Sequence, residues 1–405
     1  MHKLLIASWA GEYSGILQYR WTQPFEQLKA RGHQIVIMPD ITNKLDPDYE
    51  RNVSVCASIL SKADVLYMNS PGFMQTYEML VGVKKVNPNL KLVGDFDDDQ
   101  FNVSPYNVAY KYCGLRELKV KLDGDGSTCY ISKAKAEKDT EYMWIWKNGL
   151  NDFNAKLNRK NAKATARIIS MLDLMFVTTE RLRFKYRKYL DPKKIVIVPN
   201  AINFEAFDKY FKYDKGDGKV HIVWPVSSSH LPDWMEIRKS LGNVLKRNKN
   251  TVLVTLGVEM GCGRDIPLSQ HEHIGWAMGY AGYLYNLFTS GADIGICPLG
   301  DNRFNWKKSP IKWEEMSSMQ LPTVVSKVMY GDYVKDGVTG LVYENNLDFE
   351  TKLQRLIDSA ELRKQIGEQA YTEVRKNYNI LNVANIYESE LEKLCNKIKI
   401  IEVCK

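Results

Sequence analysis

The chain has 405 residues, of which 44% are apolar and 26% are charged. This composition is too apolar for a disordered chain, and the length suffices for two or three domains. No stretch approaches the roughly 18 consecutive apolar residues of a membrane span, and the short apolar run at 3–8 predicts a first β-strand rather than a signal peptide. The seven cysteines are scattered without a C-x-x-C pair, which argues against a disulfide framework or a cysteine-rich zinc site and predicts a cytoplasmic protein.

Short apolar runs alternate with helical stretches along the first half of the chain. Strands are expected at 3–8, 34–38, 63–68, 91–95, 172–177 and 194–198. Such alternation predicts a parallel sheet with helices on both faces, and it places ligands at the carboxyl ends of the strands. The stretch 115–130 interrupts the pattern, and its centre, Asp123-Gly124-Asp125-Gly126, predicts the turn of a hairpin inserted into this half.

The pattern restarts after residues 212–219, a polar stretch with two glycines that predicts a linker. Strands are expected at 220–225, 251–256, 293–298, 322–326 and 340–343. The predicted fold is therefore α/β, with Rossmann-like domains at 1–211 and 220–380 and a C-terminal helix at 381–405. Glycosyl transfer, ligand capture and sugar epimerisation are all compatible with two such domains facing each other across a cleft.

The net charge of +8 is concentrated in one segment. Residues 147–194 hold thirteen lysines and arginines against four acidic residues, a net charge of +9. Within the helix expected at 153–170, Lys156, Lys160 and Lys163 are spaced by 4 and 3 residues, so they share one face. Such a face indicates an anionic partner, which is nucleic acid, acidic lipid or a phosphorylated substrate, although a solvated helix surface gives the same pattern.

A helix start with basic residues follows one strand of the second sheet. Ser309 and Pro310 predict the N-cap and the first position of this helix, and Lys308 and Lys312 flank its start. Unpaired N–H groups and the positive end of the helix dipole suit a diphosphate, to which the two lysines add charge. Glu315, one turn further along, is expected to reach a pair of ribose hydroxyls.

In their order and spacing, these motifs resemble the retaining glycosyltransferases of the GT-B fold, family four of the sequence classification, along most of the chain. In that family a helix carries two glutamates spaced E-x7-E, followed by a P-V-V-x-S strand. Glu315 and residues 322–326 match the second glutamate and the strand, whereas Lys307 stands at the first glutamate position. The variant K-S-P-I-K-W-E-E is similar to a subgroup from bacteria and phages. Further motif matches lie at 177–180, 196–202 and 336–342.

The resemblance implies donor-binding roles for four loop residues. In the family, the loop after the first strand reaches the donor phosphate and the acceptor, and Gly15 is the candidate because glycine lets backbone approach a ligand closely. Ser228 and His230 follow the first strand of the second domain, where hydroxyl and backbone N–H groups would hold the diphosphate. Gly257 and the stretch 273–276 correspond to the region that cradles the nucleotide base.

Three carboxylates just past the strand expected at 91–95 form another candidate site. Clustered side chains such as Asp97, Asp98 and Asp99 can bind a divalent cation, act as a base or cap a helix. Because enzymes of the resembled fold usually work without a metal, we assign this cluster to the acceptor side. Asp97 and Asp98 would orient or deprotonate the acceptor hydroxyl, and Asp99 would contact the acceptor.

The resemblance thus implies a glycosyltransferase that moves a sugar from a nucleotide-diphosphate sugar, expected to be a UDP-sugar, to an acceptor hydroxyl with retention. Lys308 and Lys312 would stabilise the leaving diphosphate. No metal and no bound cofactor are expected. The favoured acceptor is a hydroxymethylated base in DNA that residues 147–194 grip by its phosphates. A glycan or lipid-linked saccharide is the alternative acceptor, and a non-catalytic nucleotide-sugar binder is the rival function.

Overall fold

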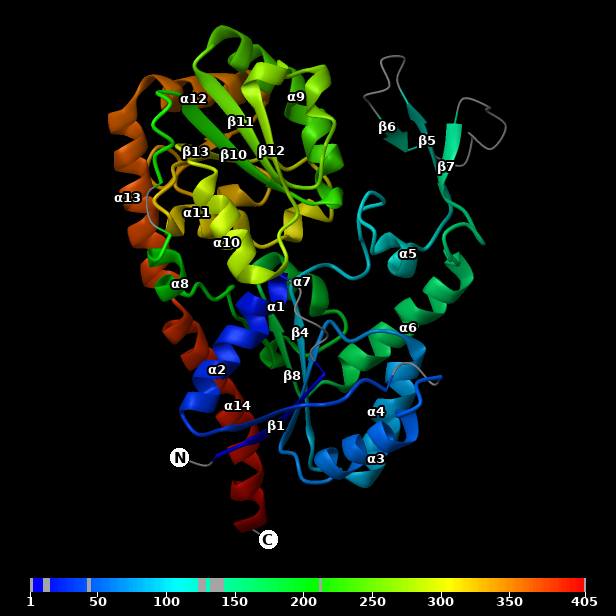
Figure 1. The fold of residues 1–405 in the computed structure, drawn as a ribbon. Helices are drawn as coiled ribbons and strands as arrows, with labels where there is room; N and C mark the ends of the chain where they lie inside the picture. The colour runs from blue at the N-terminus through cyan, green and yellow to red at the C-terminus, as the bar shows by residue number, and fades with distance from the viewer. Residues whose placement is uncertain are drawn as a thin grey trace. The chain divides into compact units, whose positions relative to one another are not determined.

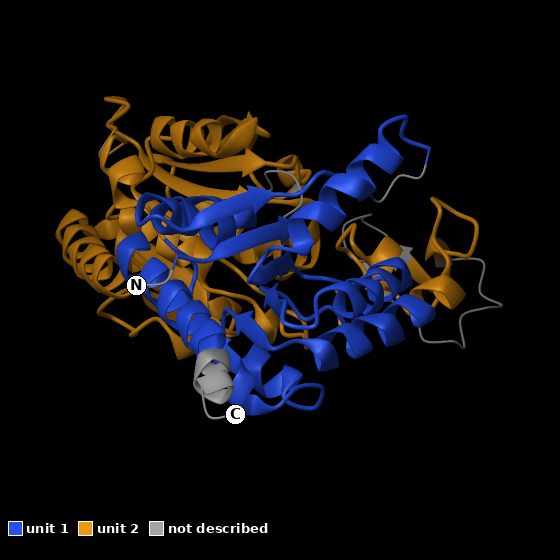
Figure 2. Ribbon diagram, turned by 90° about the horizontal axis from the view of Figure 1, so that it is seen from below, with its two compact units in different colours: residues 1–101, 159–201, 380–405 blue, residues 102–158, 202–379 orange. Residues whose placement is uncertain are grey.

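In the computed structural model the chain is described over residues 3–9, 15–41, 45–122, 129–131, 142–210 and 213–403. It forms two compact units, which Figure 2 shows in blue and orange. Unit 1 comprises 1–101, 159–201 and 380–405, and unit 2 comprises 102–158 and 202–379. Residues 102–158 therefore group with unit 2, and the C-terminal helix groups with unit 1. The domain bounds expected from the sequence are continuous along the chain, and they stay a prediction.

Unit 1 is built on a parallel six-stranded sheet with the order β2-β1-β3-β4-β8-β9. Figure 1 labels three of its strands, β1, β4 and β8. Its strands are β1 (Leu5–Trp9), β2 (Gln34–Ile37), β3 (Val65–Asn69), β4 (Lys91–Phe96), β8 (Leu174–Val177) and β9 (Ile195–Ile197). The apolar runs of β3, β4 and β8 are almost entirely buried, as expected where helices cover both faces. The strand order reverses between β1 and β3, and open α/β sheets bind ligands at the carboxyl ends of strands at such a point.

Helices fill a core on each face of this sheet. One core is formed with α3 (Tyr49–Leu60), α4 (Met74–Val86), α6 (Ala155–Met171) and α7 (Glu180–Tyr186). The other is formed with α1 (Gly15–Leu17), the π-helical turn Gln18–Thr22, α2 (Gln23–Ala30) and α14 (Ile380–Val403). Helix α7 starts where the sequence favours a cap, because the Thr179 hydroxyl accepts from the Leu182 N–H at 3.2 Å.

A buried hydrogen-bond network around one ion pair joins the C-terminal helix α14 to this sheet. Arg20 Nε and Asp95 Oδ1 lie 2.6 Å apart, and both side chains are fully buried. The second carboxylate oxygen of Asp95 accepts hydrogen bonds from Tyr67 at 2.7 Å and from Tyr387 of α14 at 2.8 Å. Arg20 also donates to the carbonyl of Val198 at 2.8 Å. Because a buried charge is tolerated only when it is paired and hydrogen-bonded, this network favours one position of α14 on the sheet.

Unit 2 contains a second parallel six-stranded sheet with the order β12-β11-β10-β13-β14-β15. Its strands are β10 (Val220–Val226), β11 (Thr251–Gly257), β12 (His271–Gly275), β13 (Ile294–Cys297), β14 (Thr323–Ser326) and β15 (Leu341–Tyr343). Counted along the chain this is the Rossmann order 3-2-1-4-5-6, which reverses between β10 and β13. The central β10 is buried along its whole length, because its sequence, apolar except for His221, lies between two helical layers.

Helices α9 (Leu231–Arg247), α12 (Asn346–Asp358) and α13 (Ala360–Asn377) contribute side chains to the core of this sheet. Unit 2 also contains α5 (Tyr110–Cys113), α8 (Phe204–Asp208), α10 (Gly279–Thr289) and α11 (Ile311–Ser318). Trp224 of β10 packs with Trp234 of α9 and Phe349 of α12 in one cluster. Within the described ranges, none of the helices has both the length and the hydropathy needed to cross a bilayer.

A small antiparallel sheet with the order β6-β5-β7 also belongs to unit 2. Its strands are β5 (Leu118–Leu122), β6 (Cys129–Ile131) and β7 (Tyr142–Trp146). β5 and β6 pair as the hairpin predicted at 115–130, whose turn at 123–126 lies outside the described residues. Of the linker predicted at 212–219, residue 212 also lies outside them, and 213–219 form neither helix nor strand.

Candidate functional site

In unit 2, one carboxylate bridges the loops that follow β10 and β13, where the strand order reverses. Asp233 lies in the first turn of α9 and is 1% exposed. Its Oδ2 lies 2.7 Å from His230 Nδ1. Its Oδ1 accepts from the backbone N–H of Gly300 at 2.7 Å and from Asn305 Nδ2 at 3.0 Å. The two loops are therefore held together at the place where Rossmann sheets bind their ligands.

The imidazole of His230 is a neutral hydrogen-bond acceptor at this place. Burial and the nearby charge of Lys308 lower the pKa of His230, and the Asp233 carboxylate opposes this only in part. A carboxylate accepts hydrogen bonds but donates none, so the neutral ring carries its proton on Nδ1 and leaves a lone pair on Nε2. His230 is thus prepared to accept a hydrogen bond from a ligand hydroxyl, and it adds no positive charge for a phosphate.

Helix α11 begins close to the predicted position after the loop that follows β13. Pro310 occupies the N-cap position and Ile311 is the first helical residue, without a side-chain cap. Ser309 therefore lies before the cap and is not the N-cap that the sequence predicted. The reason is the backbone of Pro310, whose ψ of 26° lies outside the helical range, so the helix starts one residue later than expected. The N-cap side chain therefore satisfies none of the N–H groups in the first turn of α11, and their role in holding a diphosphate stays a prediction.

The two lysines before α11 differ in their surroundings. The amino group of Lys308 lies 5.3 Å from the centre of the Phe304 ring, and its charge acts on His230. The amino group of Lys307 donates to the carbonyl of Arg303 in its own loop. The charges of Lys308 and Lys312 thus act on His230, whereas the Lys307 amino group has a backbone partner in its own loop.

Glu315 and Lys312 hold each other one turn into α11. Glu315 is 2% exposed, and its Oε2 accepts from the Tyr283 hydroxyl of α10 at 2.6 Å and from Lys312 Nζ at 2.9 Å. Lys312 Nζ also donates to the Tyr283 hydroxyl at 3.2 Å and lies 4.7 Å from the ring centre. Lys312, predicted to bind the diphosphate, and Glu315, predicted to bind the ribose, therefore hold each other in place through this hydrogen-bonded ion pair.

The carboxyl end of β11 approaches β10 closely at Gly257. Its φ is +114°, and a Cβ would lie 2.3 Å from the carbonyl oxygen of Val226, so only glycine fits. The next strand of the sheet, β12, is followed by Trp276, whose side chain is 69% exposed. Ser228 lies in the turn between β10 and α9, between two serines that hydrogen-bond to each other at 2.9 Å.

The switch point of unit 1 lies beside Gly15, which opens α1. No atom of the described residues lies within 4 Å of the position a Cβ would take there, so the missing side chain leaves open space. The rest of the predicted loop, residues 10–14, lies outside the described residues. On the neighbouring strand, β3 is followed by Ser70 and Phe73 with φ of 42° and 69°. Such strained backbone is commonly retained at functional sites.

The three carboxylates after β4 have different surroundings. Burial, followed by the neighbouring charge of Asp98, raises the pKa of Asp97 to about 7. Asp99 is fully buried, its Oδ2 lies 3.3 Å from Lys185 Nζ, and its Oδ1 accepts from the Phe101 N–H at 3.0 Å. Asp99 therefore holds the loop together, whereas Asp97 has the pKa that suits a general base.

The basic face predicted on one helix is present on α6. Lys156, Lys160 and Lys163 are all exposed and lie along the same helix. Lys156 belongs to unit 2, and the other two belong to unit 1. Solvated lysines at this spacing are suited to contacts with a chain of phosphates.

No family model and no curated protein matches this chain. Solved structures, in contrast, match it over nearly its whole length. A glycosyltransferase from Rickettsia africae ESF-5 gives a TM-score of 0.63 at 13% identity, covering 97% of this chain and 99% of that chain. Sucrose-phosphate synthase from Thermosynechococcus elongatus gives 0.59 at 13% identity, with 96% and 98% covered. HepE from Anabaena, in complex with UDP and glucose, gives 0.58 at 9% identity, with 96% and 99% covered.

These likenesses confirm the predicted fold, because the two parallel six-stranded sheets with their helices match two-domain, Rossmann-like GT-B structures.

Two residues of the candidate site are absent from the sequence-based prediction. Asp233 stands three residues after His230, where an acidic residue in the first turn of a helix is a common and unspecific feature. Tyr283 lies 32 positions before Glu315, and no local pattern relates the two.

Proposed function

We propose that this chain is a glycosyltransferase that takes its sugar from a nucleotide-diphosphate sugar, most simply a UDP-sugar. The observation that supports this best is the Rossmann switch point of unit 2. There Asp233 ties the start of α9 to the loop before α11, and Lys308 lies close enough to His230 to lower the pKa of its ring. Two helix N-termini and a lysine form a site for a diphosphate.

Each part of the donor finds a chemical counterpart in unit 2. The diphosphate takes the N–H groups at the start of α11 with Lys308 and Lys312, which stabilise the negative charge that grows as the nucleotide leaves. Glu315 accepts from ribose hydroxyls while Tyr283 and Lys312 fix its carboxylate. The indole face of Trp276 is available for stacking on the base. The Nε2 lone pair of His230 accepts from a sugar hydroxyl.

We propose that transfer proceeds with retention at the anomeric carbon. The acceptor hydroxyl gives its proton to a phosphate oxygen of the leaving group, and its oxygen bonds to the anomeric carbon. The bond between that carbon and the phosphate oxygen breaks on the same face, which leaves the glycoside and a protonated nucleoside diphosphate. The protein then contributes positioning and charge stabilisation, with Asp97 orienting the acceptor hydroxyl.

The favoured acceptor is a hydroxymethylated base in DNA. The exposed lysines of α6 support this choice, because contacts between lysines and phosphates release counterions and drive binding to DNA. The second candidate is a saccharide on a glycan or lipid. The same lysines favour it, because an anionic membrane surface attracts them equally well.

The test compares these acceptors in one assay with a mass readout. The full chain is incubated with a panel of nucleotide-diphosphate sugars, and with either duplex DNA containing 5-hydroxymethylcytosine or a lipid-linked saccharide in anionic vesicles. The proposal predicts release of nucleoside diphosphate together with a one-sugar mass increase on the DNA base. A mass increase on the lipid-linked saccharide alone would show that the proposed reaction is correct and that the acceptor is the saccharide, not DNA. Binding of the donor without transfer to any acceptor would make the chain a nucleotide-sugar binder.

A further inference from the structure

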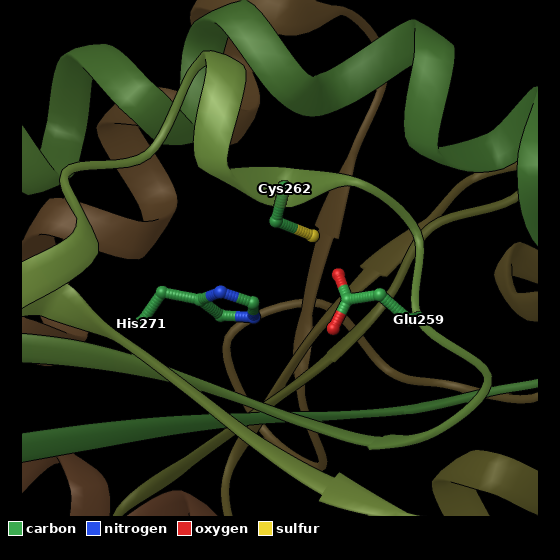
Figure 3. Close-up of side chains that lie close together, drawn as sticks. All are labelled: Glu259, Cys262 and His271. Carbon is green, nitrogen blue, oxygen red and sulfur yellow. The ribbon is translucent and has the colours of Figure 1, made fainter.

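A cysteine, a histidine and a glutamate converge where the chain connects β11 to the edge strand β12 of the unit 2 sheet. Figure 3 shows the Cys262 sulfur, the His271 ring and the Glu259 carboxylate directed toward one another. One possible ligand atom from each residue lies within 4.8 Å of those of the other two. Glu259 and Cys262 lie in the connection between β11 and β12, and His271 is the first residue of β12. We propose that these three side chains bind one zinc ion.

The chemistry of the three ligands selects the metal. Thiolate and imidazole prefer zinc and related transition metals, whereas magnesium and calcium prefer oxygen atoms alone. Zinc sites with three protein ligands leave a fourth position for water. Ligand bonds of about 2.0–2.3 Å place the three donor atoms roughly 3.5 Å apart, so closure needs only small rotations of the side chains. When zinc binds, the Cys262 thiol loses its proton to solvent and the sulfur forms a bond to the metal.

The surroundings of the three ligands differ. Thr255 Oγ1 lies 3.0 Å from His271 Nε2 and 3.0 Å from His273 Nδ1, so one hydroxyl orients both rings. Cys262 is fully buried in the core of unit 2. The Glu259 side chain is 53% exposed, so this ligand of the proposed site faces solvent. Zinc would join the connection between β11 and β12 to the edge strand.

A second group of possible ligands, in unit 1, lacks these features. His33 Nδ1 lies 3.2 Å from the Leu4 N–H and accepts from it, and its Nε2 lies 3.0 Å from Glu388. Arg31 also pairs with Glu388, so a cation at this place would compete with an arginine. This group has no thiol among its three members. It therefore serves as a control for metal binding.

The experiment titrates the full chain, purified without a tag and stripped by a chelator, with Co²⁺ and then with Zn²⁺. We expect one equivalent of Co²⁺ to produce a near-ultraviolet thiolate-to-cobalt band, which one equivalent of Zn²⁺ removes. Cys262→Ser should abolish the band, and Glu259→Gln should weaken Co²⁺ binding at least tenfold. Cys56→Ser, which removes another buried thiol, should leave the band and the Co²⁺ affinity unchanged. Added Zn²⁺ should also raise the melting temperature of the wild type, because only the folded chain assembles the site.

Three outcomes would overturn the zinc site. The first is a wild-type chain without a thiolate-to-cobalt band. The second is a band that persists in Cys262→Ser. The third is binding that His33→Gln removes and Glu259→Gln leaves intact, because the ion would then lie in unit 1. If Cys262→Ser fails to fold, Glu259→Gln decides the question, since this side chain is largely exposed and its loss should not disturb the core. Sugar transfer enters none of these measurements, so the zinc site and the proposed function can fail separately.

Discussion

His230 Nδ1 lies 2.7 Å from Asp233 Oδ2, and the second oxygen of the same carboxylate accepts from the backbone N–H of Gly300 at 2.7 Å. A single buried side chain thus fixes the tautomer of the histidine and the position of the loop that leads to Lys308. Both consequences matter for the proposed donor site, because charge stabilisation works only when the charged groups are held in place before the reaction.

Removing this carboxylate should impair donor binding. Asp233→Ala leaves the Gly300 N–H without its acceptor, so we expect a loss of about 1–3 kcal/mol in the free energy of unfolding and at least a tenfold loss of UDP affinity. The control is Asp293→Ala, since Asp293 accepts from the His221 N–H at 2.9 Å at the amino ends of β10 and β13, opposite to the carboxyl ends that carry the candidate site. The control should lose stability and keep its UDP affinity. Equal UDP affinities in the two variants, measured by calorimetry, would contradict the assignment.

Glu315 should contribute to donor affinity through the ribose. Glu315→Ala removes a buried, charge-assisted acceptor, and we expect UDP binding to weaken by about 1–3 kcal/mol. Tyr283→Phe keeps the carboxylate and removes the hydroxyl that donates to it at 2.6 Å, so its effect should be smaller. If calorimetry finds the UDP affinity of Glu315→Ala unchanged, the ribose contact is wrong.

The lysines around the start of α11 should differ in their effect on turnover. Lys308→Ala and Lys312→Ala should each lower kcat at least tenfold, because each removes positive charge from the leaving diphosphate. Lys307→Ala is the matched control, because the Lys307 amino group donates to a carbonyl in its own loop. Steady-state release of nucleoside diphosphate measures all three. A larger loss in Lys307→Ala than in the other two would show that the register of the site is wrong.

The free energy of unfolding should depend on the protonation of Asp97. Its pKa is about 7 in the folded chain, against 3.8 for an ordinary aspartate, so the folded state binds a proton more tightly than the unfolded state does. Asp97 therefore makes the free energy of unfolding fall as pH rises from about 4 to about 7. Asp97→Asn should flatten this fall and increase stability above pH 7. Asp98→Asn should move the fall to lower pH, because the charge of Asp98 raises the pKa of Asp97. Urea unfolding at several pH values that shows no difference between wild type and Asp97→Asn would contradict the shifted pKa.

The basic face of α6 should control acceptor binding alone. Reversal of Lys156, Lys160 and Lys163 to glutamate should raise the KM for DNA and flatten its salt dependence, whose slope is about −0.9 per phosphate contacted. The KM for the donor should stay the same, since the proposed donor groups lie in unit 2 and none of them is on α6. If the triple variant loses binding to anionic vesicles and the wild type never binds DNA, the saccharide acceptor is favoured. If the wild type binds neither polymer at low salt, the lysines are a solvated surface.

The sequence predicts the strands that are covered on both faces, because these are short apolar runs that stand out from amphipathic helices. It misses the edge strand β12, whose sequence HEHIG is mostly polar and whose side chains are largely exposed. The placement of the last helix is a different matter. It depends on contacts between segments far apart, such as the hydrogen bond from Tyr387 to Asp95 that attaches α14 to unit 1. No periodicity within either segment encodes that contact, so the sequence-based bounds treat the last helix as a separate element.

The candidate sites likewise combine residues that are close in the sequence with contacts that only the fold creates. Lys308, Lys312 and Glu315 stand in one local motif and are predictable from spacing. Their coupling through Tyr283 is not, since it joins α10 to α11. The proposed zinc ligands are spaced as E-x2-C-x8-H, which falls outside the cysteine pairs that define familiar zinc motifs. The fold alone brings Glu259, Cys262 and His271 together, at the turn into an edge strand.

The central claim is that the start of α11 in unit 2 holds a nucleoside diphosphate by its phosphates. Calorimetric titration of the wild-type chain with UDP and with uridine tests this most directly, and Lys308→Ala and Lys307→Ala are titrated in parallel. The account predicts one UDP per chain, bound at least a hundredfold more tightly than uridine, with this ratio reduced at least tenfold in Lys308→Ala and unchanged in Lys307→Ala. Equal affinities for UDP and uridine in the wild type, or a ratio that Lys308→Ala leaves intact, would contradict it.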